Sequence, residues 1–179
     1  MDAYATEAAF VAVEECFTAI EASPLPVVAA VEGAAVGAGC QLALAADLLV
    51  MAATACIGMP AVRLGIRASP PFVARVSRRA GKAIAADQLL TGRLTGAEEA
   101  SRCGLAARMV PAGGAMDEAR RLAARLPAPL SGLTAVKRGL AATDPPGGAP
   151  LDRVIVPATV DRAALLTAVD DFFARARSS

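Results

Sequence analysis

A glycine-rich turn between two apolar segments is the part of the sequence best suited to chemistry. The apolar run Val27–Val31 predicts a buried strand, and Cys40–Ala46 predicts a short buried helix. The turn between them, Gly33–Gly39, ends the strand and starts the helix. A helix that starts in this way presents backbone N–H groups without helical partners, and its dipole adds positive potential. We therefore expect the turn to stabilise negative charge, as half of an oxyanion hole does for a polarised carbonyl.

Side chains for acid–base chemistry are limited, because the sequence contains no histidine. This excludes Ser-His-Asp and Cys-His nucleophile systems and histidine-based zinc sites. The cysteines are scattered, without a C-x-x-C pair, at Cys16, Cys40, Cys56 and Cys103. We expect no metal site, and reduced, mostly buried thiols in a cytoplasmic protein. Catalysis would therefore rest on carboxylates, lysines or thiols.

The charge balance argues against a nucleic-acid or membrane protein. The 179 residues carry a formal net charge of +1, so no general basic surface is expected. Charged residues interrupt the longest apolar stretch before it reaches the length of a membrane span. Arginines do cluster locally, at Arg75, Arg78 and Arg79. They indicate either a solvated helix face or a contact with an anion such as a phosphate.

Hydrophobic periodicity predicts an α/β fold in one domain. A second strand, Leu48–Ala52, follows the first strand and its helix, and this order predicts a parallel βαβ unit. A capping-box pattern at Thr95–Glu98 predicts a helix that Gly104 ends. An amphipathic helix is predicted over about Ala3–Ala22, with an apolar face formed by Ala9, Val13, Cys16, Phe17 and Ile20. The other predicted elements are an apolar piece over Ala55–Met59, a strand over Ala106–Val110, and helices over Phe72–Arg79, Lys82–Leu90, Met116–Leu126, Leu130–Ala142 and Val160–Arg177.

Three segments in order, Pro26–Asp47, Gly65–Gly81 and Thr91–Leu105, resemble the crotonase superfamily, the enoyl-CoA hydratase/isomerase family. The resemblance implies an α/β fold of the crotonase type, a ββα spiral followed by a helical C-terminal region. Residues 1–112 would form a partial spiral core, and residues 113–179 a helical trimerisation region. The implied assembly is a trimer or a dimer of trimers that binds an acyl-CoA thioester. No separate cofactor is expected, because coenzyme A is part of the substrate.

In the family, a backbone N–H in the middle of a glycine triplet polarises the thioester carbonyl and stabilises an enolate-like intermediate. The resemblance assigns this donor to Ala38, with Gly37 and Gly39 as substrate-binding residues on either side. Alanine can serve because the donor belongs to the main chain, provided that its φ is negative. The alternative is that the two glycines only allow the helix to pack closely on the strand.

Two positions that hold catalytic glutamates in the hydratases differ in this sequence. They correspond to Gln41 and to Ala61, which follows the proline of Gly58-Met-Pro. A glutamine can orient a water molecule but cannot exchange a proton at neutral pH, and an alanine can do neither. The resemblance therefore implies thioester binding and polarisation, with hydration by the two-glutamate route disabled.

The loop beyond Ala61 departs from the family pattern as well. The family glycine whose amide can hold the catalytic water corresponds to Ser69, which we therefore predict to be a substrate-binding residue. Pro71 and Phe72 replace two glycines, adding bulk and removing one N–H donor. Arg63 and Arg67 flank this loop. They are either solvated charges or contacts for an acyl carboxylate or a CoA phosphate.

Three residues near the turn are expected to be structural. Asp47 matches a family aspartate where the helix meets a strand, and we interpret it as structural. Glu32 is the other carboxylate closest to the turn; we expect it to point elsewhere, with a role as substitute base as the alternative. Cys40 is expected to be a buried packing thiol.

Towards the C-terminus, Asp171–Arg175 resembles a family ending in which an aromatic and a basic residue help to cover the CoA nucleotide. Phe172 and Arg175 are therefore candidate substrate contacts, or else a core aromatic and a solvated charge. Lys137 lies where the family often has lysine, with no role assigned.

Family members carry a further segment before the point where this sequence starts. That segment holds the first β units and an A-x-G-x-D loop that supplies the second oxyanion N–H. Three hypotheses follow for the sequence as given. It is an enzyme-like acyl-CoA-binding protein, a non-catalytic acyl-CoA carrier or regulatory subunit, or a shortened fragment with an exposed sheet edge.

Overall fold

The computed structural model describes residues 3–127 and 130–142, and their helices and strands follow the predicted order. The elements are α1 (Ala3–Ala22), β1 (Val28–Val31), β2 (Ala34–Val36), α2 (Ala38–Ala45), β3 (Leu48–Ala52), β4 (Cys56–Gly58), the 3₁₀-helix η1 (Pro60–Leu64), α3 (Pro70–Thr91), β5 (Thr95–Gly96), α4 (Ala97–Arg102), β6 (Arg108–Val110), α5 (Ala115–Ala124) and α6 (Leu130–Ala142). The predicted helix over Val160–Arg177 lies outside the described residues.

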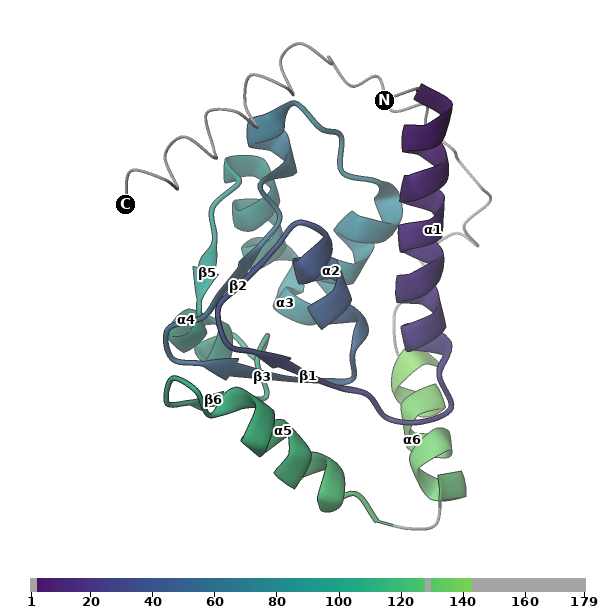
Figure 1. Cartoon of the computed structure of the whole chain (residues 1–179), viewed down its shortest axis with the longest axis vertical. Helices are drawn as coiled ribbons and strands as arrows, with labels where there is room; N and C mark the ends of the chain where they lie inside the picture. The colour runs from purple at the N-terminus through teal and green to yellow at the C-terminus, as the bar shows by residue number, and fades with distance from the viewer. Residues whose placement is uncertain (1–2, 128–129, 143–179) are drawn as a thin grey trace.

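Two small three-stranded sheets lie at the centre of the described chain, and successive strands enter them alternately (Figure 1). β1, β3 and β6 pair in parallel, with Val28 opposite Leu48 and Val50 opposite Arg108. β2 pairs in parallel with β4, and β4 pairs antiparallel with β5. The chain runs β1, β2, α2 and then β3, β4. Each pair of consecutive strands therefore adds one strand to each sheet. The predicted parallel βαβ unit is confirmed, and it is part of a ββα spiral.

The prediction that Gly33–Gly39 is only a turn is wrong, because the segment contains a strand. Ala34–Val36 forms β2, in register with Cys56–Gly58 of β4. Three small residues between glycines show too little alternation to predict a strand from sequence. The helix that follows starts at Ala38, two residues earlier than predicted.

The predicted capping box at Thr95–Glu98 is also wrong. The N-cap of α4 is Gly96, and no side chain caps the helix. Thr95 of β5 is fully buried and pairs with Ile57 of β4. Its hydroxyl accepts a hydrogen bond from Gln88 Nε2. Thr95 therefore belongs to the sheet and is not the N-cap of α4.

Two predicted helices, Phe72–Arg79 and Lys82–Leu90, are joined in α3. They remain separate helical segments, because Gly81 lies between them with φ 76° and ψ 156°. Only glycine adopts this conformation without strain. The break lets the first segment pack on α2 while the second runs on towards β5.

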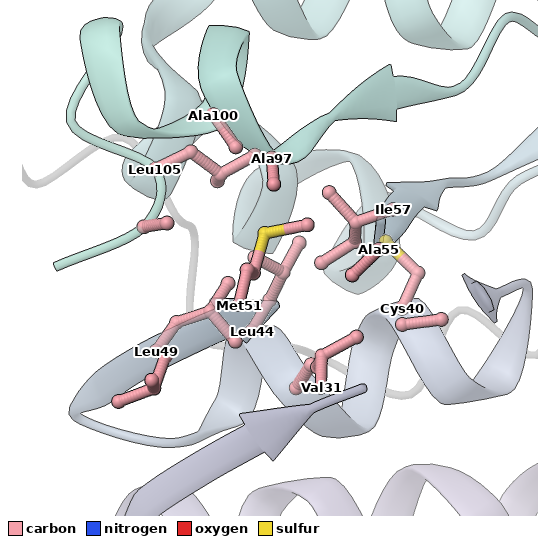
Figure 2. Close-up of a cluster of buried hydrophobic side chains, with 14 of the residues drawn as sticks. Val31, Cys40, Leu44, Leu49, Met51, Ala55, Ile57, Ala97, Ala100 and Leu105 are labelled. Carbon is pink, nitrogen blue, oxygen red and sulfur yellow. The ribbon is translucent and has the colours of Figure 1, made fainter. Parts of the chain in front are cut away.

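The core beneath α2 is aliphatic (Figure 2). Leu49 and Met51 of β3 are 1% and 0% exposed, and Cys40 and Leu44 of α2 pack with them in one cluster. Alanines of α4 and α5 complete the cluster, which lets these helices approach the strands closely. This packing fixes the start of α2 relative to both sheets.

α1 has the predicted bounds and runs along one side of the molecule (Figure 1). Its buried stripe differs from the predicted one. Phe17 is buried and Val13 and Ile20 are half-buried, whereas Ala9 and Cys16 are exposed. The stripe is displaced because α1 also turns two acidic residues towards α3, as described below.

Asp47 ties three distant parts of the chain together. Its Oδ2 accepts hydrogen bonds from the Val27 amide (2.7 Å) and from Lys137 Nζ (2.8 Å). The same ammonium group donates to the carbonyls of Ile20 and Leu25, both at 3.2 Å, so α6 lies beside the C-terminal end of α1 (Figure 1). The structural interpretation of Asp47 is confirmed, and Lys137 is its partner.

Replacing Lys137 by alanine is expected to lower the free energy of unfolding by about 2 kcal/mol, since hydrogen bonds to charged groups contribute about 1.5–3 kcal/mol. Chemical denaturation measures the loss. Arg138→Ala on the exposed face of α6 is the control and should change stability by no more than about 0.5 kcal/mol. Equal effects of the two substitutions would contradict the role assigned to Lys137.

Candidate functional site

The start of α2 has the geometry of an anion-stabilising turn. Gly37 is the N-cap with φ 61° and ψ −119°, and its amide donates to the Gly58 carbonyl at 3.0 Å. The first helical hydrogen bond runs from the Gln41 amide to the Gly37 carbonyl (3.1 Å). The earlier amides of the helix, at Ala38 and Gly39, have no partner within it, and both residues are exposed. The turn therefore leaves these two N–H groups without helical partners, on exposed residues.

The condition set for Ala38 is met, because no non-glycine residue among those described has a positive φ. The alternative interpretation of the glycines is wrong. A Cβ added at Gly37 or Gly39 would meet no described atom within 4 Å, so neither glycine serves close packing. Gly37 is required for its left-handed φ, and Gly39 leaves the approach to the turn open.

Gln41 lies one turn into α2 and is fully buried. Its Oε1 accepts a hydrogen bond from Arg75 Nη1 at 2.9 Å, and its Nε2 has no partner among the described residues. The guanidinium fixes the orientation of this amide, so the two N–H groups of Nε2 are left to donate to a further group.

Arg75 is the centre of a buried group of side chains from α1, α2 and α3. Its Nη2 lies 2.8 Å from Glu14 Oε1, and its Nε lies 2.9 Å from Glu21 Oε1. The guanidinium also lies over the ring of Phe17, 5.2 Å from its centroid. We call Arg75, Glu14, Glu21, Gln41 and Phe17 the Arg75 cluster.

Charge pairing keeps Arg75 ionised in spite of its 2% exposure. Burial alone would lower the pKa of Arg75, but the hydrogen bonds and charges of Glu21 and Glu14 outweigh it and raise this pKa. Sequence reasoning missed the cluster. The signal was the spacing of Glu14, Phe17 and Glu21, which places all three on one face of α1.

The three clustered arginines have partners within the chain, and only Arg78 is exposed as a solvated helix face predicts. Arg75 belongs to the Arg75 cluster, and Arg78 pairs with Glu21 at 3.0 Å. Arg79 donates to the carbonyls of Ala46 and Asp47 at the C-terminal end of α2, where a cation is favourable. These side chains hold α3 against α1 and α2.

Ala61 lies in η1 and is 6% exposed. It packs in an apolar group with Phe17, Ala45, Met59 and Phe72. The rings of Phe17 and Phe72 meet edge to face with centroids 6.0 Å apart. The bulky side chain of Phe72 thus packs inside this apolar group. Phe17 belongs to both this group and the Arg75 cluster.

An apolar cavity of about 410 Å³ adjoins Ala61. It lies between η1, the loop that follows and α3, and it is lined by Met59, Ala61, Val62, Gly65, Ile66, Arg67, Ala68, Val73, Leu89 and Leu90. Ser69 does not line it. Ser69 is the N-cap residue of α3, and its Oγ is buried without a partner among the described residues.

Other predicted residues have structural positions. The Glu32 carboxylate accepts hydrogen bonds from the amides of Gly113 (3.0 Å) and Ala115 (2.7 Å), so it caps α5 and points away from the turn, as expected. Arg63 is exposed, in line with a solvated charge, and it lies along Gly92 and donates from Nε to the Thr91 carbonyl at 2.9 Å.

Cys40 is a buried packing thiol, as predicted (Figure 2). Burial raises the pKa of its thiol to about 12, although a hydrogen bond with the Gly58 backbone acts in the opposite direction. The thiol is therefore neutral and unreactive near neutral pH. Phe172 and Arg175 lie outside the described residues. Within the described ranges, no group of acidic residues and cysteines could hold a metal ion, and no helix is long and apolar enough to cross a membrane.

Comparison with known proteins identifies the family of the chain. Residues 4–144 match the family model of enoyl-CoA hydratase/isomerase. The chain is 46% identical over 98 residues to a Mycobacterium bovis protein named "probable enoyl-CoA hydratase", covering 55% of this chain and 38% of that protein. It is 44% identical over 98 residues to the carnitinyl-CoA dehydratase of Proteus mirabilis, with the same two coverages.

A solved structure is similar over nearly the whole chain. The enoyl-CoA hydratase/carnithine racemase of Magnetospirillum magneticum superposes with a TM-score of 0.74 at 28% identity, covering 96% of this chain and 60% of that one. The chain therefore belongs to the enoyl-CoA hydratase/isomerase family and has the crotonase fold. It spans 38% of the length of the curated relatives just described.

Proposed function

We propose that this chain binds acyl-CoA thioesters at the start of α2, where the Ala38 N–H polarises the thioester carbonyl. The observation that carries the proposal is that Ala38 is an exposed residue at the first position of α2, where its amide has no partner within the helix. Amides of this kind favour negative charge on an oxygen, and the family acts on such thioesters. The proposal extends to self-association as a trimer or hexamer in the cytoplasm.

We further propose that hydration by two glutamates does not operate here. The Gln41 amide has its oxygen on Arg75, and Ala61 lies among apolar side chains. Neither residue can take up or release a proton. These contacts also favour the second candidate, a carrier or regulatory subunit that binds the thioester without turnover.

Calorimetric titration with crotonyl-CoA tests both candidates. Ala38→Pro removes the N–H donor at the first position of α2, where proline is tolerated, and Ala38→Ser keeps the donor as the matched control. We expect binding by the native and serine forms, and about tenfold weaker binding by the proline form.

A hydration assay on the same samples separates the outcomes. Binding without product supports the carrier function. Turnover at ordinary hydratase rates that is insensitive to Gln41→Ala would contradict the carrier function and would mean that other residues supply the acid–base chemistry. No binding of crotonyl-CoA by the native chain would contradict the proposed function itself.

A further inference from the structure

The cavity beside Ala61 contains one charged side chain. Its lining residues, all within the described part of the chain, are apolar or glycine except for Arg67. The volume of about 410 Å³ lies within the range of small-ligand pockets, about 300–1,000 Å³. The cavity therefore suits a ligand with an apolar body.

Arg67 differs from its neighbours in having no partner. Arg63 donates to the Thr91 carbonyl, and Arg75 is held by two carboxylates. Arg67 is exposed and makes no hydrogen bond or ion pair with any described residue. Its guanidinium is thus available at the edge of the cavity, where it can bind a carboxylate through two N–H groups.

The lining contains no acid that would oppose an anion. Ala61 contributes a methyl group to the wall, and no aspartate or glutamate is among the lining residues. A carboxylate in this cavity would meet one cation and no like charge, and the apolar wall would strengthen the attraction relative to open water. A neutral acyl group would gain nothing from Arg67.

We propose that this cavity receives an acyl group that ends in a carboxylate, and that Arg67 pairs with this carboxylate. The inference rests on the proposed function, because it assigns the acyl class of the thioester bound at the start of α2. Arg67 is then a specificity-determining residue for the acyl group.

Titration with three probes tests the proposal: glutaryl-CoA, valeryl-CoA, which has the same number of acyl carbons without the carboxylate, and free CoA. We expect the native chain to bind glutaryl-CoA about tenfold more tightly than valeryl-CoA at low salt, with a smaller preference at high salt. Arg67→Gln should remove this preference and leave valeryl-CoA binding unchanged. Arg102→Gln, an exposed arginine of α4 away from the cavity lining, is the control and should keep the preference.

Several results would overturn the inference. Equal binding of valeryl-CoA and glutaryl-CoA by the native chain would reject it while leaving the proposed function intact. If Arg67→Gln weakens the binding of free CoA as much as the binding of glutaryl-CoA, Arg67 contacts a CoA phosphate and the inference is wrong. If no thioester binds, both the inference and the proposed function are wrong. Arg67→Lys should retain part of the preference, and thermal unfolding of each variant confirms that it is folded.

Discussion

Replacing Arg75 by methionine is expected to lower the free energy of unfolding by about 3 kcal/mol, because it leaves two half-buried carboxylates and the buried Gln41 oxygen without their partner. The side chain is 2% exposed and lies at 2.8 and 2.9 Å from Glu14 and Glu21. Domains of this size are stable by about 5–15 kcal/mol, so the loss would remove a large share of the total. Urea denaturation measures it.

Two controls show whether the loss comes from unpaired charge. Arg78→Met removes a half-exposed partner of Glu21 and should cost less than about 1 kcal/mol. Adding Glu14→Gln and Glu21→Gln to Arg75→Met removes the orphaned charges and should recover part of the stability. If the single Arg75 variant loses less than the Arg78 variant, the Arg75 cluster does not hold the three helices together.

Placing a glutamate at position 61, as the hydratase pattern would have it, is expected to destabilise this chain. Ala61 is 6% exposed among aromatic and aliphatic side chains, so a carboxyl group there would lose most of its water, and the exposed Arg67 at the edge of the adjoining cavity would offset only part of this cost. Burial would raise the pKa of the introduced carboxyl. A shift of about two units corresponds to a loss of about 3 kcal/mol at neutral pH.

The stability of Ala61→Glu is expected to change with pH in a defined direction. In the unfolded chain the new carboxyl ionises above about pH 4.3, whereas in the folded chain it stays protonated to higher pH. The folded state then binds more protons, so the stability of Ala61→Glu relative to the native chain falls as pH rises through this interval. Unfolding measured at about pH 4 and about pH 8 tests the trend.

Val62→Glu is the matched control, since Val62 is the next residue of η1 and is half exposed. It should cost little and show no such pH dependence. A loss for Ala61→Glu that is small and constant with pH would mean that this position has access to water. In that case the apolar packing around Ala61 would not explain the absence of a glutamate.

The parts of the fold that could be predicted from sequence have one strong local signal each. Leu48–Ala52 and Leu130–Ala142 have their predicted bounds, because each is a continuous periodic segment ended by turn residues or a change of pattern. Ala34–Val36 was missed because its pairing with β4 supplies the strand character that three small residues lack.

Only the part of the site that consists of backbone groups could be predicted from sequence. The turn at Gly37 follows from glycine content, and the structure keeps it. The surroundings of Gln41 could not be predicted, since they depend on Arg75, which is 34 residues away, and on acids of α1. Contacts between helices that are distant in sequence need the tertiary arrangement, and local patterns do not encode it.

The anchoring of α6 has a consequence for the order in which the molecule assembles. No residue of α6 is buried among those described, and the helix is held to Asp47 and to the end of α1 by the ammonium of Lys137. These contacts close loops of 90 and 117 residues, so they form slowly and only after the strands around Asp47 are in place. We therefore expect the last helix of the described chain to dock late, onto a core that has already formed.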